Sequence, residues 1–196
     1  MVVLTGPSGS GKSSLAAYLE RQGWKRLDGD VLARSLYVPG SALMKKMLQV
    51  FGRGILQPDG SLNRVRLGEI VFPSLAQRRR LNALVYPPFL RAVKKAMKLA
   101  RQRRQRLVAD LAVYFDSGAP DLGVPVVLVD APLAVRVARL RLRGLSPARA
   151  KAQASALSVT RAHRAAADLC LDGRLSKRSL QAQLSRSLRP PLSAGR

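Results

Sequence analysis

A glycine-rich segment near the amino terminus constrains the fold of this chain more than any other feature. Residues 6–13 read Gly-Pro-Ser-Gly-Ser-Gly-Lys-Ser and match the pattern G-x-x-x-x-G-K-[ST]. The apolar run Val2–Thr5 before this segment predicts a buried strand, and the apolar spacing within Lys12–Gln22 predicts a helix. A glycine-rich turn between a strand and a helix is the arrangement of a phosphate-binding loop.

The residue types in this loop suit a nucleoside triphosphate. Backbone N–H groups of the turn and of the helix N-terminus converge on phosphate oxygens. Lys12 supplies a mobile positive charge for the β and γ phosphates, and the Ser13 hydroxyl can ligate Mg²⁺. The motif alone does not separate a kinase from a GTPase, a motor or a transporter ATPase. The expected nucleotide-binding residues are Gly6, Pro7, Ser8, Gly9, Ser10, Gly11, Lys12, Ser13 and Ser14.

The rest of the chain alternates strands with helices, which predicts an α/β protein with a mainly parallel sheet covered on both faces. Further strands are expected at Arg26–Asp28, Leu107–Leu111, Val124–Val129 and Asp168–Leu171. Helices are expected at Val31–Tyr37, Ser41–Phe51, Ser61–Phe72, Pro88–Arg106, Leu133–Arg143, Ala148–Ala167 and Ser176–Leu188. We expect one domain over 1–196, with a long helical insert at about 37–106 and a frayed tail at 190–196.

Charge and composition exclude several classes of protein. The 196 residues include 35 Lys or Arg and 11 Asp or Glu, so the formal net charge is +24. Such a field attracts nucleic acid, anionic membrane or phosphorylated metabolites, although the same cations also suit solvated helix faces. No apolar run approaches the length needed to cross a bilayer. We expect a soluble cytoplasmic protein, with the single Cys170 a buried thiol in a strand.

Two carboxylates lie at the end of the second expected strand, at the sheet edge that also holds the loop. In a kinase, one carboxylate of Asp28-Gly29-Asp30 can accept the proton of an attacking hydroxyl while the other holds metal through water. Asp30 also stands where a helix N-cap is expected, before Val31. The two roles of Asp30 are compatible.

The order and spacing of these and later motifs resemble the dephospho-coenzyme A kinase family. The resemblance covers nearly the whole chain up to Gly173, and the pattern Asp-Gly-x-Leu-x-Arg followed by Leu, Ile and Phe is distinctive. Beyond the loop it rests on Leu27-Asp28-Gly29-Asp30, Ala33-Arg34, Pro39-Gly40, Phe51-Gly52, Asp59-Gly60-Ser61-Leu62-Asn63-Arg64 with Leu67, Ile70 and Phe72, Leu81-Asn82-Ala83-Leu84 with Pro87, and Ala167-Asp168.

The resemblance implies a P-loop kinase of three layers, with a five-stranded parallel sheet, a helical insert that binds the acceptor, and a mobile lid. It also implies that ATP, with Mg²⁺ as cofactor, phosphorylates the ribose 3′-hydroxyl of dephospho-coenzyme A to give coenzyme A and ADP. Both ligands are small molecules, and a monomer or weak oligomer is expected.

The expected site residues fall into three groups, which rest on the loop motif and on the resemblance. The catalytic group is Lys12, Asp30, Arg139 and Arg143, the two arginines lying in a lid at about 139–150. The acceptor-binding group is Asp28, Asp30, Arg34, Arg64 and Tyr86. The metal-binding group is Ser13 of the loop and Asp110, because P-loop enzymes commonly hold the water shell of the metal with a carboxylate at the end of the strand beside the loop. A solvated helix face is the alternative for Arg139 and Arg143, because the same helix carries further arginines at Arg136 and Arg141.

Four positions depart from the usual pattern of this family. Tyr86 replaces a His, Asp110 stands in the place of a Pro, Leu157 in that of a Gln, and Gly173 in that of an Asn associated with adenine.

Two other readings stay open. The loop also resembles the opening of guanylate kinases, which would make the chain a P-loop kinase of another small acceptor such as a nucleotide. A degenerate kinase could instead bind nucleic acid through the basic segments Arg78–Arg80 and Lys94–Arg106. Against specific nucleic-acid binding, aromatic residues are 5% of the chain and are not interleaved with the cations.

Overall fold

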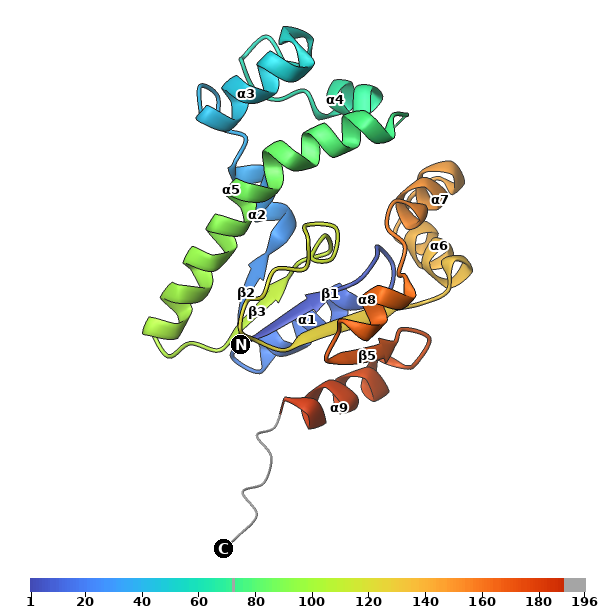
Figure 1. The fold of residues 1–196 in the computed structure, drawn as a ribbon. Helices are drawn as coiled ribbons and strands as arrows, with labels where there is room; N and C mark the ends of the chain where they lie inside the picture. The colour runs from blue at the N-terminus through green and yellow to red at the C-terminus, as the bar shows by residue number, and fades with distance from the viewer. Residues whose placement is uncertain (72, 189–196) are drawn as a thin grey trace, which may run out of the picture. The chain divides into compact units, whose positions relative to one another are not determined.

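A computed structural model describes residues 1–71 and 73–188, which are drawn as a ribbon in Figure 1. The tail expected at 190–196 and the motif residue Phe72 lie outside the described residues.

The chain divides into two compact units. Met1–Leu27 and the chain from Ala100 onward form one of them, here called the sheet unit. Asp28–Leu99 form the other, here called the helical unit, which includes most of the insert expected at about 37–106. Each unit has its own buried cluster of apolar side chains.

A five-stranded parallel sheet organises the sheet unit, and the predicted fold class is confirmed. The strands lie in the order β2-β3-β1-β4-β5, with β1 parallel to both β3 and β4 (Figure 1). Every residue of β1 and β3 is buried, as is usual for parallel strands covered on both faces. The strands are β1 (Val2–Thr5), β2 (Lys25–Asp28), β3 (Leu107–Asp110), β4 (Val126–Asp130) and β5 (Leu169–Asp172).

Two helices, α1 (Lys12–Arg21) and α9 (Lys177–Ser187), pack against one face of this sheet. Strand residues two apart share a face, so Val2 and Leu4 of β1 point to the same helices. The same apolar cluster packs α1 against β1, the strand that leads into the glycine-rich turn. Its other buried members include Leu15, Leu19, Val108, Val127, Leu171, Leu180 and Leu184.

After β4 the chain forms α6 (Leu133–Leu142) and α7 (Pro147–Ser155), which pack through Leu140, Ala150 and Ala154. The prediction of one continuous helix at Ala148–Ala167 is wrong. Helix α7 ends at Ser155, and a separate short helix, α8 (Arg161–Ala165), follows it. The break falls in a Ser- and Thr-rich stretch, and Thr160 caps α8 by accepting a hydrogen bond from the His163 N–H at 3.1 Å.

The helical unit consists of short helices around a core of Leu, Met, Ile and Val side chains. Ser41 caps α3 with its hydroxyl, which accepts a hydrogen bond from the Met44 N–H at 3.2 Å. The elements of this unit are α2 (Gly29–Ser35), α3 (Ala42–Phe51), the 3₁₀ turn η1 (Arg53–Ile55), α4 (Arg64–Val71) and most of α5 (Leu75–Gln102).

Helix α5 begins at Leu75 rather than at Pro88, where the sequence predicted it. Pro87 and Pro88 lie inside the helix although each removes a backbone hydrogen bond. The buried residues continue across them at helical spacing, namely Val85, Phe89, Val93, Met97 and Ala100. Among the described residues, neither α5 nor any other helix is both long and apolar enough to span a membrane.

The prediction of a buried Cys170 is wrong, because this thiol is exposed. Strand β5 lies at the edge of the sheet, next to β4 alone. The side chain of Leu171 points into the core, whereas Cys170 points to the opposite face. Because only one face of the edge strand β5 is covered by the core, the Cys170 thiol on its other face is accessible to solvent.

Candidate active site

The glycine-rich turn lies at the carboxyl end of β1 and leads into α1, as the sequence predicted. Gly6 has φ of 136°, and a Cβ at this position would collide with the Val129 carbonyl oxygen of β4. Only glycine combines this φ with so close an approach. The turn closes through a hydrogen bond from the Ser10 N–H to the Pro7 carbonyl at 3.2 Å.

Three charged side chains meet beside this loop. The Lys12 Nζ donates to Oδ1 of Asp110, and Nη2 of Arg26 donates to Oδ2 of the same carboxylate at 2.5 Å. Asp110 pairs with Leu4 in the register of β3 and β1, which places it next to the strand that enters the loop. Its side chain is 3% exposed, so two cations compensate a buried negative charge.

The two residues expected to hold Mg²⁺ fit the ion unequally. Ser13 is exposed in the first turn of α1, where a metal on the phosphates can be reached. Both oxygens of Asp110 already accept from cations, so this carboxylate suits a water ligand of Mg²⁺ better than the ion itself. Across 1–71 and 73–188, no three His, Cys, Asp or Glu side chains group to hold a metal. The residues therefore fit a metal that arrives with the nucleotide.

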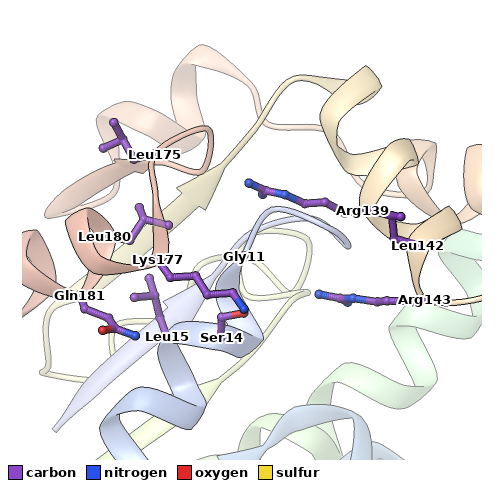
Figure 2. A pocket seen from close by; sticks show the side chains of 10 residues that line it. All are labelled: Gly11, Ser14, Leu15, Arg139, Leu142, Arg143, Leu175, Lys177, Leu180 and Gln181. Atoms are coloured by element: carbon purple, nitrogen blue, oxygen red, sulfur yellow. The ribbon is translucent and has the colours of Figure 1, made fainter.

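Arg139 of α6 binds the loop through its backbone. Its Nη1 donates to the carbonyls of Gly9 and Ser10 at 3.2 and 3.1 Å, and its Nη2 donates to the Gly173 carbonyl at 2.6 Å. These contacts exclude a purely solvated role for Arg139. Arg143, the residue that follows the end of α6, is exposed and points toward the same region in Figure 2.

Arg136, which the sequence suggested was a spare surface arginine, is buried. Its Nε donates to the Ala131 carbonyl at 2.9 Å, and its Nη1 donates to the carbonyls of Ala154 and Leu157 at 2.5 and 3.3 Å. The guanidinium thus ties the start of α6 to the end of α7. No sequence pattern marks this role, because all three acceptors are backbone atoms.

A cavity of about 330 Å³ opens next to the loop, between α1, α6 and the start of α9 (Figure 2). Its walls are largely apolar, and Lys177 and Gln181 of α9 add polar groups that sequence reasoning missed. These two residues could have been predicted from the helix expected after the fifth strand. That helix begins at the carboxyl ends of the parallel strands, which is also where the loop lies. The lining residues are Gly11, Ser14, Leu15, Arg139, Leu142, Arg143, Leu175, Lys177, Leu180 and Gln181.

Gly173, which follows β5, packs directly against the loop. A Cβ at this position would overlap the Ser10 carbonyl oxygen and lie 2.9 Å from that of Asp130. Both contacts are backbone atoms, so the loop itself would have to shift. The Asn that the related pattern carries here cannot be accommodated by this backbone arrangement.

We therefore expect Gly173→Ala to lower the melting temperature by about 2–10 °C, since overpacking a tight site costs about 1–3 kcal/mol. ATP affinity should fall as well, because Ser10 belongs to the loop. Thermal unfolding and calorimetric titration with ATP measure the two effects. Gly54→Ala is the matched control, as a Cβ there meets nothing within 4 Å. Identical melting of the two variants would contradict the prediction.

In the helical unit, the predicted capping role of Asp30 is wrong. Asp28 is the N-cap of α2, and its Oδ1 accepts from the N–H groups of Asp30 and Val31 at 2.9 and 3.1 Å. Asp30 follows in the first turn of α2 with an exposed side chain. Arg34 lies four residues later, on the same side of α2. Asp28 therefore caps the helix, while Asp30 keeps an exposed carboxylate that makes no cap.

Arg64, at the start of α4, stacks on an aromatic ring within the same unit. Its guanidinium carbon lies 5.0 Å from the centre of the Tyr37 ring. Burial raises the pKa of Tyr37, and the nearby Arg64 charge opposes that rise. Tyr37, which sequence reasoning did not single out, is thus neutral at physiological pH and orients Arg64. Tyr86, the remaining predicted acceptor residue, is half-buried in α5.

Comparison with known proteins adds independent observations. A family model described as dephospho-CoA kinase matches residues 1–177. The dephospho-CoA kinase of Shouchella clausii is 36% identical over 92% of this chain and 93% of its own length. A solved Thermus thermophilus structure superposes with a TM-score of 0.74 at 28% identity, covering 95% of both chains. The structure of a Campylobacter jejuni dephospho-CoA kinase shares the fold, with a TM-score of 0.68 at 20% identity over 95% of this chain and 94% of its own.

Proposed function

The chain belongs to the dephospho-CoA kinase family, and we propose that it transfers the γ-phosphoryl group of ATP to the ribose 3′-hydroxyl of dephospho-CoA, which gives CoA and ADP. The observation that carries this proposal is the glycine loop at the end of β1, with Lys12 at the first position of α1. The family match over residues 1–177 identifies the acceptor.

On the donor side, the loop N–H groups and Lys12 bind the phosphates of ATP and stabilise the charge that develops on the transferring group. Ser13 would hold Mg²⁺ directly and Asp110 would hold it through a water molecule. The ion, when bound, withdraws charge from the β and γ oxygens. The cavity beside Gly11 and Ser14 takes the adenine, because its apolar walls adjoin the start of α1.

On the acceptor side, Asp30 accepts the proton of the attacking hydroxyl. Its exposed carboxylate in the first turn of α2 supports this role, since capping falls to Asp28. Arg34 and Arg64 bind the phosphates or ribose of dephospho-CoA, and the stacking of Arg64 on Tyr37 supports a fixed orientation. Asp28 and Tyr86 complete the acceptor-binding set.

Arg139 and Arg143 belong to a lid at about 139–150 that closes over the transferring group. The contacts of Arg139 with the loop carbonyls support its proximity to the phosphates. The Arg136 hydrogen bonds join α6 and α7, so the two helices would move together as the lid closes.

An acceptor panel tests the proposed function. The protein is incubated with Mg²⁺, ATP labelled in the γ-phosphate, and dephospho-CoA, AMP or GMP as acceptor. We expect label only in CoA, as a 3′-phosphomonoester identified by phosphorus NMR. Transfer to AMP or GMP but not to dephospho-CoA would support the nucleotide-kinase alternative. Tight ATP binding without any transfer would support a degenerate kinase.

Nucleic-acid binding is expected to be weak despite the net charge of +24. Helix α5 carries an exposed row of cations and no acid, but the chain offers few aromatic side chains on which bases could stack. Random duplex DNA should bind at low salt and dissociate at physiological salt, as expected for nonspecific affinities of about 10⁻⁵ M. A salt series of fluorescence anisotropy measures this. Tight binding that survives physiological salt would favour the nucleic-acid alternative.

The setting of the reaction is part of the same proposal. The protein works in the cytoplasm, where ATP is abundant and an exposed thiol such as Cys170 stays reduced. It acts as a monomer or weak oligomer, because one chain supplies every wall of the cavity beside the loop. Analytical ultracentrifugation at assay concentration tests this state of assembly.

A further inference from the structure

The pairing of Lys12 with Asp110 raises a problem for nucleotide binding. The lysine that must reach the phosphates is the partner of a buried carboxylate on β3. A buried carboxylate that loses a partner becomes costly, because its charge is neither solvated nor fully paired. ATP binding therefore requires that Asp110 stay compensated when Lys12 leaves it.

Arg26 has the position and the charge to meet this need. Its Nη2 donates to the second oxygen of Asp110 at 2.5 Å, so each oxygen has its own cation. Its Nη1 lies 3.7 Å from the Glu20 carboxylate of α1, which holds the guanidinium from the other side. The Arg26 side chain is also partly withdrawn from water, at 23% exposed.

We propose that Arg26 is a positioning residue that acts through Asp110: it keeps the carboxylate paired so that Lys12 can transfer to the nucleotide phosphates. The proposal rests on the proposed function, because it assumes that Lys12 binds ATP. Without a second cation on Asp110, the buried carboxylate would hold Lys12 away from the nucleotide.

Three variants test whether Arg26 affects ATP binding through Asp110 or only through its positive charge. In Arg26→Met, Lys12 alone of the two described cations would still pair with Asp110, so its release should cost more and ATP should bind more weakly. In Asp110→Asn, no buried charge holds Lys12, so ATP should bind at least as tightly as to the unaltered protein. In the double variant, the loss of Arg26 should matter little, because its partner is already neutral.

The measurement is calorimetric titration of the full chain with ATP in EDTA, which removes any contribution of Asp110 through Mg²⁺. We expect Arg26→Met to weaken binding about tenfold, within the range for directly coupled side chains, and the double variant to bind like Asp110→Asn. Lys25→Met is the matched control, since Lys25 is the exposed neighbour on β2 and its loss removes the same charge.

Two outcomes would overturn the proposal. Binding to Arg26→Met as tight as to Lys25→Met would show that Arg26 has no role in releasing Lys12. An equal loss of affinity with and without Asp110→Asn would show that Arg26 acts independently of the carboxylate. If Arg26→Met does not fold, Arg26→Lys replaces it and should weaken binding less than tenfold in the same cycle. Because dephospho-CoA is absent from this titration, failure of the acceptor assay leaves its result interpretable.

Discussion

Alanine in place of Lys12 is expected to lower kcat for dephospho-CoA phosphorylation by about 10²–10³, the usual effect of losing one group that stabilises the transition state. The fold should persist, because Asp110 keeps Arg26 as a partner at 2.5 Å. Release of ADP in a coupled assay at saturating substrates measures kcat. Circular dichroism verifies that the variant is folded.

The exposed Lys25 provides the control for Lys12. Lys25→Ala removes a positive charge from β2 without touching the loop, so its kcat should match that of the unaltered protein. A Lys12→Ala variant that kept more than about a tenth of the activity would contradict the assignment of this lysine to the phosphates.

Asparagine in place of Asp30 should lower kcat by about 10²–10⁴, the contribution typical of a general base. The substitution keeps the shape of the side chain but removes its ability to accept a proton. Stability should hardly change, because Asp28 provides the cap of α2. ATP affinity should also be preserved, since the expected contacts of Asp30 are with the acceptor. Single-turnover measurement of phosphoryl transfer, together with ATP titration, separates these effects.

Glu69→Gln is the matched control for Asp30 in the helical unit. Glu69 is an exposed acid whose ion pair with Arg66 spans a single helical turn, and such pairs contribute little to stability. The Glu69→Gln variant should keep full activity. Equal activity of Asp30→Asn and Glu69→Gln would remove Asp30 from the catalytic residues.

The loop and the sheet could be predicted from sequence because short-range physics determines both. A glycine pattern between an apolar run and an amphipathic segment leaves few alternatives for the backbone of Gly6–Ser13. Strands β1, β3 and β4 are buried on both faces, so their continuous apolar residues mark them directly. The match between expected and observed strands follows from this.

Helix boundaries and burial were harder to predict because they depend on tertiary packing. The prolines at 87 and 88 favour a helix start, yet buried residues on both sides keep α5 continuous. Cys170 sits in an apolar run, yet its strand has a neighbour on one side alone. Local residue preference was outweighed by the neighbours that the fold supplies.

The arginines of α6 show the same limit at the candidate site. Arg136 and Arg139 are separated by one turn, and the local sequence distinguishes neither from the exposed Arg141, so Arg139 was selected by the family resemblance alone. Their acceptors are carbonyl groups brought together by α7, the loop and the residue after β5. Arg26 was missed for a related reason: its partner Asp110 is remote in sequence, on β3.

The exposed thiol of Cys170 has a practical consequence. It is the one cysteine in the sequence, so a maleimide fluorophore would attach to the unaltered protein at a single known position. That position is absent from the walls of the cavity beside the loop, so a dye there leaves the way open for ATP. Nucleotide titrations of every variant can thus be followed by fluorescence without engineering an attachment point.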